Sequence, residues 1–193
     1  MKIVPIVSVN NFKGASDGIR PFKQITSKTA ENLYNTDFNY SDKNFKYCFQ
    51  TFVLAEKSGE PIEVYVKPRY LQDSYEEFEI YQYIKYNGLS CIGMRRYEYD
   101  LQSKKIIPGY MEAEKIGLKG IGFRLHQVTF ERMLMRCCKN IELLSTPQAY
   151  PFHNALGYIG SKESGILNLS KAAKKDWLKI IQKQPILIGK AKF

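Results

Sequence analysis

Three glycines, Gly117, Gly120 and Gly122, separate a β-prone segment from a segment with helical apolar spacing. Glycine inside a regular element costs about 0.5–1 kcal/mol, so such a cluster marks a sharp turn or a close approach of the main chain. We therefore expect a strand over Gly109–Glu114, a glycine-rich loop, and a helix over Ile121–Cys138. Two interpretations of the loop stay open: a tight strand-to-helix turn, or a backbone cradle for an anion.

The cradle interpretation rests on the properties of a helix start. The first N–H groups of a helix lack partners within the helix and lie at the positive end of its dipole. Glycines let the main chain approach a phosphate and adopt positive φ, which forms an anion nest. Lys119 and Arg124 would add positive charge. The spacing differs from the dinucleotide fingerprint, whose close glycine pair comes first, and no G-K-[ST] follows for a P-loop.

Composition narrows the class of protein. A chain of 193 residues with 44% hydrophobic residues is typical of one globular domain. Its net charge of +10 predicts attraction to nucleic acid, a membrane surface or a phosphorylated cofactor. No recognisable nucleic-acid-binding motif is present, and no apolar run approaches the ~18 residues that span a bilayer. With four cysteines lacking CxxC spacing and two histidines, we expect no metal site and a cytoplasmic protein.

The chain before the glycine cluster is expected to contain two hairpins and a helix. Apolar runs at Phe49–Ala55 and Ile62–Val66 flank the turn sequence KSGEP, which predicts the first hairpin. The segment 73–87 begins with good N-cap residues, has glutamates in its first turn and ends at Asn-Gly, so it is predicted to be a helix. The second hairpin is expected over Ile92–Asp100 and Ile106–Glu114.

The remaining elements are shorter. Residues 1–48 are poorly legible and read as loops around a short helix at Thr29–Tyr34. After the central helix we expect a buried strand at 141–145 and a short helix between Thr146 and Gly157. The whole chain is interpreted as a single domain, with residues 161–193 as a basic C-terminal extension.

The extension allows two interpretations. Seven lysines face one aspartate between Lys171 and Lys192, and Trp177 is among the apolar residues beside them. A basic amphipathic helix can bind an acidic partner or lie on a membrane. Alternatively, a terminal helix packs its apolar side on the domain, and the sequence PILIG adds an edge strand.

Two motifs resemble the GNAT N-acetyltransferase superfamily. Gly117-x-x-Gly120-x-Gly122 is similar to its coenzyme A pyrophosphate loop, [QR]-x-x-G-x-[GA], and Ala149–Tyr158, AYPFHNALGY, is similar to its A-x-P-F-Y-x-x-L-G-F helix. They occur in the family's order within Gly109–Tyr158, about a quarter of the chain. The resemblance implies a mixed α/β (α+β) fold with a central, mainly antiparallel twisted sheet flanked by helices. It also implies acetyl transfer from acetyl-CoA to a primary amine by direct attack.

The resemblance also implies where the donor binds. Backbone N–H in the strand before the loop would hold the thioester carbonyl, and the loop would hold the pyrophosphate. Gly117 stands where the family has Gln or Arg, so a side-chain donor is missing, and Lys115 or Lys119 could replace it. The residues expected at the donor are Met111, Ala113, Lys115, Gly117, Leu118, Lys119, Gly120, Ile121, Gly122, Phe123, Arg124 and Phe152.

Three side chains are candidates for proton transfer. Glu112 and Glu114 should share a strand face, where either could deprotonate the amine; the alternative is a solvated face paired with Arg95 or Arg96. His153 stands where many family members have the tyrosine that protonates the leaving thiolate. An imidazolium with a pKa near 6.5 could protonate a thiolate whose conjugate acid has a pKa of ~8.5. A structural histidine, or loss of activity, is the alternative.

The acceptor and the partners stay open. An amine-bearing small molecule, a peptide or a protein would each fit the expected chemistry. The competing class is a non-enzymatic module that binds a polyanion or acyl-CoA as a degenerate acetyltransferase.

Overall fold

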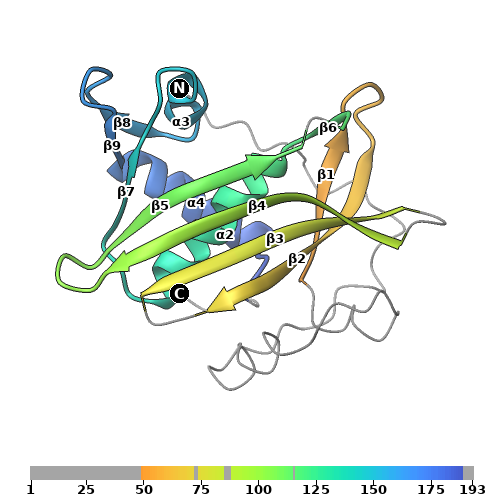
Figure 1. Ribbon diagram of the computed structural model, residues 1–193, viewed down its shortest axis with the longest axis horizontal. Coiled ribbons are helices and arrows are strands. Elements are labelled where there is room, and N and C mark those ends of the chain that lie inside the picture. Colours follow the sequence, from red (N-terminus) through yellow and green to blue (C-terminus); the bar gives the residue numbers. More distant parts are fainter. Residues whose placement is uncertain (1–48, 72–73, 85–87, 115, 189–193) are drawn as a thin grey trace.

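The computed structural model describes residues 49–71, 74–84, 88–114 and 116–188, so the helix expected at Thr29–Tyr34 lies outside it. Within these residues the strands form one curled, mixed sheet of nine strands, with helices packed against it (Figure 1). This α+β arrangement agrees with the expected fold class. The strands are β1 Phe49–Ala55, β2 Pro61–Leu71, β3 Tyr75–Ile84, β4 Gly88–Asp100, β5 Lys105–Ala113, β6 Leu118–Lys119, β7 Asn140–Leu144, β8 Tyr158–Gly160 and β9 Ile166–Leu169, and the helices are α2 Ile121–Met135, α3 Tyr150–Ala155 and α4 Lys171–Lys183.

The sheet is an antiparallel meander with one parallel junction. Its order is β6-β1-β2-β3-β4-β5-β7-β9-β8, and β5–β7 is the only parallel pair among the described strands. Parallel strands need a crossover connection, which α2 supplies between β5 and β7. Both predicted hairpins, the central helix and the strand at 141–145 are therefore confirmed in position. The central helix ends at Met135, three residues earlier than predicted, before Cys137 with its φ of 53°.

The helix predicted over 73–87 is wrong, because this segment contains β3. The strand pairs with β2 on one side and with β4 on the other. Its aromatic and β-branched residues suit a strand with both neighbours present, and all five residues from Glu76 to Ile80 are buried. The glutamates that resembled a first helical turn are instead held by arginines, as Glu76 is by Arg132.

The middle of the central helix α2 is buried on all sides. Every residue from Phe123 to Glu131 is buried, including polar ones. Strands β3, β4 and β5 pack on it from one side and α4 contacts it from another (Figure 1). A helix with this surrounding must bond its polar side chains inside the protein, because a buried polar group without a partner costs free energy.

The basic tail packs its apolar side on the domain, as the second interpretation of the extension expected. Ala173, Trp177 and Ile181 of α4 are buried. The Trp177 ring lies with its centroid 4.7 Å from the Phe123 ring, and its Nε1 donates to the carbonyl of Leu156 at 3.1 Å. The tail is therefore part of the core.

Glu131 joins α2 to the residues after α4. Its carboxylate accepts backbone N–H groups of Ile186 and Ile188, each at 2.9 Å, and of Leu187 between them. It also accepts Nε2 of Gln127 at 3.0 Å. The edge strand predicted for PILIG is therefore wrong in its described part: these N–H groups bind a carboxylate instead of a neighbouring strand.

Replacing Glu131 with glutamine should lower the free energy of unfolding by about 1–3 kcal/mol. Glutamine offers one acceptor oxygen, and its amide N–H groups would face backbone donors that the carboxylate now satisfies. Urea unfolding of the two proteins measures the difference. The matched control is Glu163→Gln in an exposed turn, which should stay within about 0.5 kcal/mol of the wild type. Equal effects of the two substitutions would contradict the anchoring role.

Candidate functional site

The sheet opens between β5 and β7. These strands pair only at Lys105–Asn140 and Ile106–Ile141. Beyond that point β7 pairs with β9 through Glu142–Leu144, whereas β5 continues alongside β4 to Ala113. The two strands visibly diverge in Figure 1. No described strand pairs with the β7-facing edge of β5 after Ile106.

A β-bulge coincides with this opening. Arg95 pairs with Met111 and Tyr97 pairs with Pro108, so one residue of β4 opposes two residues of β5. A bulge bends its strand and increases its local twist. Pro108 has no N–H for a ladder and Gly109 follows it, a combination that occurs in sheets at edges and bulges. The bulge therefore explains why β5 leaves β7.

The start of α2 lies beside the opening. Gly120 is its N-cap with φ 99°, and Gly117 has φ 74°, so both occupy the left-handed region that favours glycine. No side chain caps the helix, and its first turn contains no acidic residue. The N–H of Arg124 is the first to bond within the helix, to the carbonyl of Gly120 at 2.9 Å. The N–H groups before it have no partner within the helix.

The glycine loop is held from its other side by β1. In β6, Leu118 pairs with Ala55 and Lys119 pairs with Leu54. The N–H of Glu56 donates to the carbonyl of Gly117 at 2.7 Å. The loop is therefore fixed to the sheet through its neighbours.

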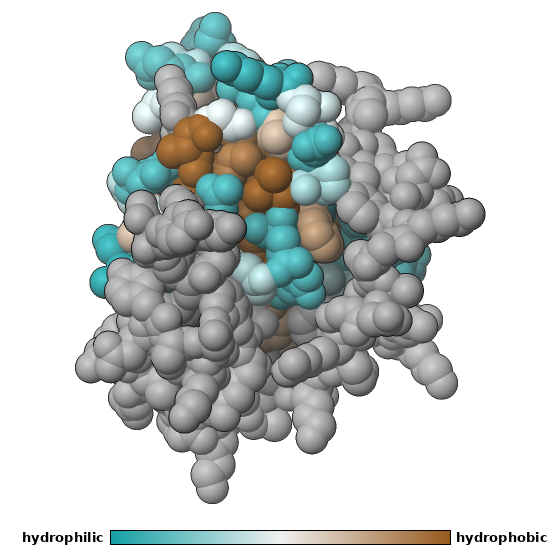
Figure 2. All heavy atoms as spheres, turned by 90° about the vertical axis from the view of Figure 1, so that its right-hand side faces the viewer, coloured by the Kyte–Doolittle hydropathy of each residue, from teal (hydrophilic) through white to brown (hydrophobic). Residues whose placement is uncertain are grey.

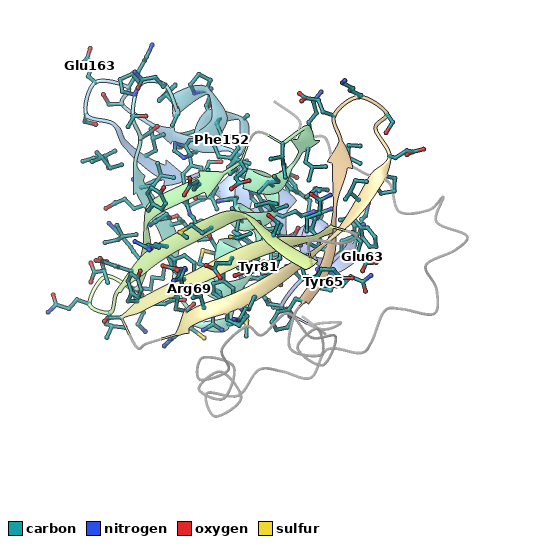
Figure 3. All side chains as sticks on the ribbon, turned by 45° about the vertical axis from the view of Figure 1, so that its right-hand side comes forward. Glu63, Tyr65, Arg69, Tyr81, Phe152 and Glu163 are labelled. Carbon is teal, nitrogen blue, oxygen red and sulfur yellow. The ribbon has the colours of Figure 1, made fainter. Side chains whose placement is uncertain are left out.

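Residues from three elements meet at the opening. A Cβ at Gly122 would lie 3.0 Å from Cζ of Phe152 and 3.6 Å from Cε of Met111. Phe152 belongs to α3 and is labelled in Figure 3. A side chain at position 122 would therefore crowd the Phe152 ring. The fold brings together three residues, Met111, Gly122 and Phe152, that the sequence assigned to the donor site.

The same side of the molecule carries an apolar area. Figure 2 views the molecule from the side toward which β5 ends and β6 lies in Figure 1. Apolar residues gather on this face and polar residues border them. Ile116, between β5 and β6, is one of the exposed apolar side chains of the protein.

Other predicted donor residues point elsewhere. Ile121 and Phe123 are buried in the core, and Leu118 packs against it. Arg124 is also buried: its Nε donates to the carbonyl of Phe52 at 2.8 Å and its Nη1 to Gln127 at 2.8 Å. Its guanidinium therefore bonds groups inside the protein, and its contribution of charge to the loop stays a prediction.

Lys119 is a described cation within the loop itself. Its side chain is exposed, and its Nζ lies 3.9 Å from a carboxylate oxygen of Glu56. Ala113 is exposed at the end of β5. Lys115 lies outside the described residues.

The two candidate bases are exposed at the end of β5. Glu112 accepts a hydrogen bond from the hydroxyl of Tyr110 at 2.7 Å, and this bond raises the pKa of Tyr110. Glu114 follows it, with its backbone N–H bonded to the carbonyl of Ile92 at 2.9 Å. The alternative pairing with Arg95 or Arg96 does not occur in the described residues, since Arg96 bonds Glu77 and Arg95 is buried.

His153 does not have the electrostatics expected of a general acid. Its ring is buried, and its Nδ1 lies 2.9 Å from Oγ of Ser145. Burial and, to a lesser extent, the charge of Arg95 lower the pKa of His153 to about 4. The imidazole is therefore neutral at pH 7, and the protonated acid that the sequence predicted does not fit this environment.

The sequence analysis missed three members of this region. Tyr110 gave no signal beyond the Pro-Gly sequence that precedes it. Ser145 and Tyr158 are separated along the chain but flank His153, whose ring centroid lies 6.0 Å from that of Tyr158. No local pattern marks such a contact.

Within the described residues, no group of three or more histidine, cysteine, aspartate or glutamate side chains is placed to hold a metal ion. None of the described helices combines the length and apolar character needed to cross a membrane.

No protein-family model and no curated protein matches the chain. Among solved structures, nourseothricin acetyltransferase is 18% identical over 77% of this chain and 94% of that chain, with a TM-score of 0.37. Two variants of a cAMP-binding acyltransferase from Mycobacterium smegmatis are each 8% identical to this chain. The first match covers 80% of this chain and 65% of that chain, with a TM-score of 0.46. The second match covers 81% of this chain and 64% of that chain, with a TM-score of 0.42. TM-scores below 0.5 do not establish a shared fold, so a function has to be argued from the geometry of this chain's own residues.

Proposed function

We propose that the protein transfers an acyl group, acetyl in the simplest case, from a coenzyme A thioester to a primary amine. The observation that carries this proposal is the uncapped start of α2 beside the opening between β5 and β7. The N–H groups at an uncapped helix start can bind phosphates. A strand edge without a neighbouring strand can form hydrogen bonds with the amide groups of the donor's extended arm. The apolar area on this side of the molecule adds a surface for the rest of that arm (Figure 2).

The donor would bind along these features in a fixed order. Phosphates would meet the N–H groups of the first turn of α2, where glycines keep the main chain accessible. The thioester arm would enter the opening past Met111, Gly122 and Phe152. The free edge of β5 would offer backbone N–H to the thioester carbonyl, where negative charge develops during attack.

Glu112 is our preferred base. Its carboxylate is exposed at the end of β5 and oriented by the Tyr110 hydroxyl, so it could take the ammonium proton directly or through water. The amine nitrogen then attacks the thioester carbon, the carbon–sulfur bond breaks, and the nitrogen gives up its second proton to water as the amide forms. The leaving thiolate has a conjugate acid with a pKa of ~8.5, so it can depart unprotonated and take a proton from water. A protonated His153 is not required.

Replacing Glu112 with glutamine should lower kcat about 10-fold and leave donor affinity unchanged. This is less than the 10²–10⁴ of a sole general base, because Glu114 remains beside it. Free thiol release at several pH values, with donor binding measured by calorimetry, provides the readout. Glu98→Gln is the control, since Glu98 is an exposed glutamate of β4. An unchanged pH profile in the Glu112 variant would assign the proton to another group.

The proposal is tested by titrating the protein with acetyl-CoA and following thiol release across amine and peptide acceptors. Binding with turnover supports it. Binding without turnover would favour the second candidate function, an acyl-CoA-binding module. The neutral His153 at the position expected for the general acid also favours this candidate. Oligonucleotide binding that weakens with salt, without thioester binding, would overturn both in favour of a polyanion-binding module.

A further inference from the structure

Arg95 lies on β4, beside the strand that borders the opening, and is one of the most deeply buried charged residues of the sheet. It is 3% exposed and pairs in register with Met111 of β5. Directly paired residues of neighbouring strands place their side chains on the same face. The Arg95 side chain therefore leaves the sheet on the face where Met111 borders the opening.

No acidic side chain neutralises Arg95 within the described residues. Its Nε has no hydrogen-bond partner there. The buried carboxylates of the sheet and of α2 are used elsewhere: Glu76 by Arg132, Glu77 and Glu79 by arginines at the sheet surface, and Glu131 by backbone N–H groups.

The neighbours of Arg95 are polar but uncharged. Its charge lowers the pKa of both His126 and His153, after burial, which is the larger cause for each. The hydroxyl of Tyr158 lies 3.3 Å from Nδ1 of His126, and Nε2 of His126 has no partner in the described residues. With Tyr158 donating to Nδ1, the proton of the neutral ring is on Nε2, which adds a second unpaired donor near Arg95.

A guanidinium stays protonated in proteins, and burying an unpaired charge is expensive. Such a site is complementary to an anionic group that arrives with a ligand. A carboxylate fits best, since it accepts two parallel N–H bonds from one guanidinium. The phosphates of the donor already have the start of α2, which lies at the surface of the opening.

We propose that Arg95 forms the floor of the acyl pocket and binds the free carboxylate of a dicarboxylic acyl group, such as succinyl. The inference rests on the proposed function, because the acyl group enters through the opening beside Met111. In the reaction the amine nitrogen bonds the thioester carbon, the carbon–sulfur bond breaks, and Glu112 takes the amine proton. The distal carboxylate keeps its charge throughout and is carried into the amide product.

The experiment compares kcat/KM for acetyl-, butyryl- and succinyl-CoA with one amine acceptor. Butyryl is the neutral chain of matched carbon number. We expect succinyl-CoA to exceed butyryl-CoA by at least about 10-fold, the size of one charge-assisted hydrogen bond. Arg95→Met should remove this preference and bring the succinyl-to-butyryl ratio of kcat/KM to about one.

The matched control is Arg96→Met, on the same strand but exposed on the opposite face. It should leave the succinyl-to-butyryl ratio unchanged, whatever its effect on the overall rate. Thermal unfolding gives a second readout: Arg95→Met should melt at the wild-type temperature or above it, because it removes an unpaired buried charge. A variant that melts several degrees lower would assign Arg95 a structural role and overturn the inference.

The two proposals fail in different ways. Transfer from acetyl- or butyryl-CoA that equals or exceeds transfer from succinyl-CoA would overturn the assignment of Arg95 and leave the proposed function intact. Absence of binding to all three thioesters would overturn both.

Discussion

Replacing Glu76 with alanine is expected to lower the free energy of unfolding by about 3–5 kcal/mol, the range for breaking a buried ion pair. Glu76 is fully buried in β3, and its carboxylate receives hydrogen bonds from Arg132, Arg136 and Tyr97. The cluster joins two strands to the C-terminal end of α2, where cations are also favourable to the helix dipole. Alanine would leave the largely buried Arg132 without its carboxylate.

Urea unfolding at neutral pH measures this loss. Asp176→Ala is the control, because it breaks an exposed pair with Lys179 on α4 and should cost at most about 0.5 kcal/mol. A Glu76→Ala variant as stable as this control would show that the cluster contributes nothing net.

The same cluster predicts a pH dependence. Burial alone would raise the pKa of Glu76, but the hydrogen bonds and charges of Arg132 and Arg136 outweigh it, so the pKa lies below its usual value. A carboxylate with a lowered folded-state pKa stabilises the protein fully above the unfolded-state pKa of about 4.3. Its contribution is lost as the pH falls through the folded-state pKa. The difference between wild type and Glu76→Ala should therefore shrink under acid conditions below about pH 4.

Replacing Gly120 with aspartate is expected to weaken donor binding by about 100-fold or more, which corresponds to about 2.7 kcal/mol of repulsion between the carboxylate and the phosphates. Gly120 is the N-cap of α2 with φ 99°. Aspartate tolerates this conformation better than most residues, so the helix should persist. Its carboxylate would also compete for the N–H groups that the donor needs.

The Gly120→Asn variant separates the effect of the new negative charge on donor binding from the effect of the larger side chain. Asparagine has nearly the same size and the same tolerance of positive φ, so it should weaken donor binding by less than about 10-fold. Gly59→Asp, at an open hairpin turn with φ 70°, controls for a general effect of the new charge. Calorimetry with coenzyme A measures all three. Equal affinities of the aspartate and asparagine variants would remove the phosphates from this loop.

Local patterns predicted the elements whose signals lie in adjacent residues. The glycine cluster and the apolar spacing after it located the loop and α2, and the turn residues located both hairpins. The segment of β3 was misjudged, because its aromatics and glutamates satisfy a helical period as well as a strand period. The neighbouring strands β2 and β4, which pair with its two edges, stabilise the strand conformation of this segment.

The candidate site also contains residues that local sequence patterns predicted and properties that only the tertiary structure determined. The sequence alone singled out the glycines, Met111, Phe152 and the glutamates of β5 as candidates, because motif spacing and strand alternation are local properties. The protonation state of His153, the inward turn of Arg124 and the lack of a counter-charge for Arg95 depend on burial and on residues far along the chain. A side chain's dielectric surroundings and charge partners exist only once the fold brings distant segments together, so only the tertiary structure could decide them.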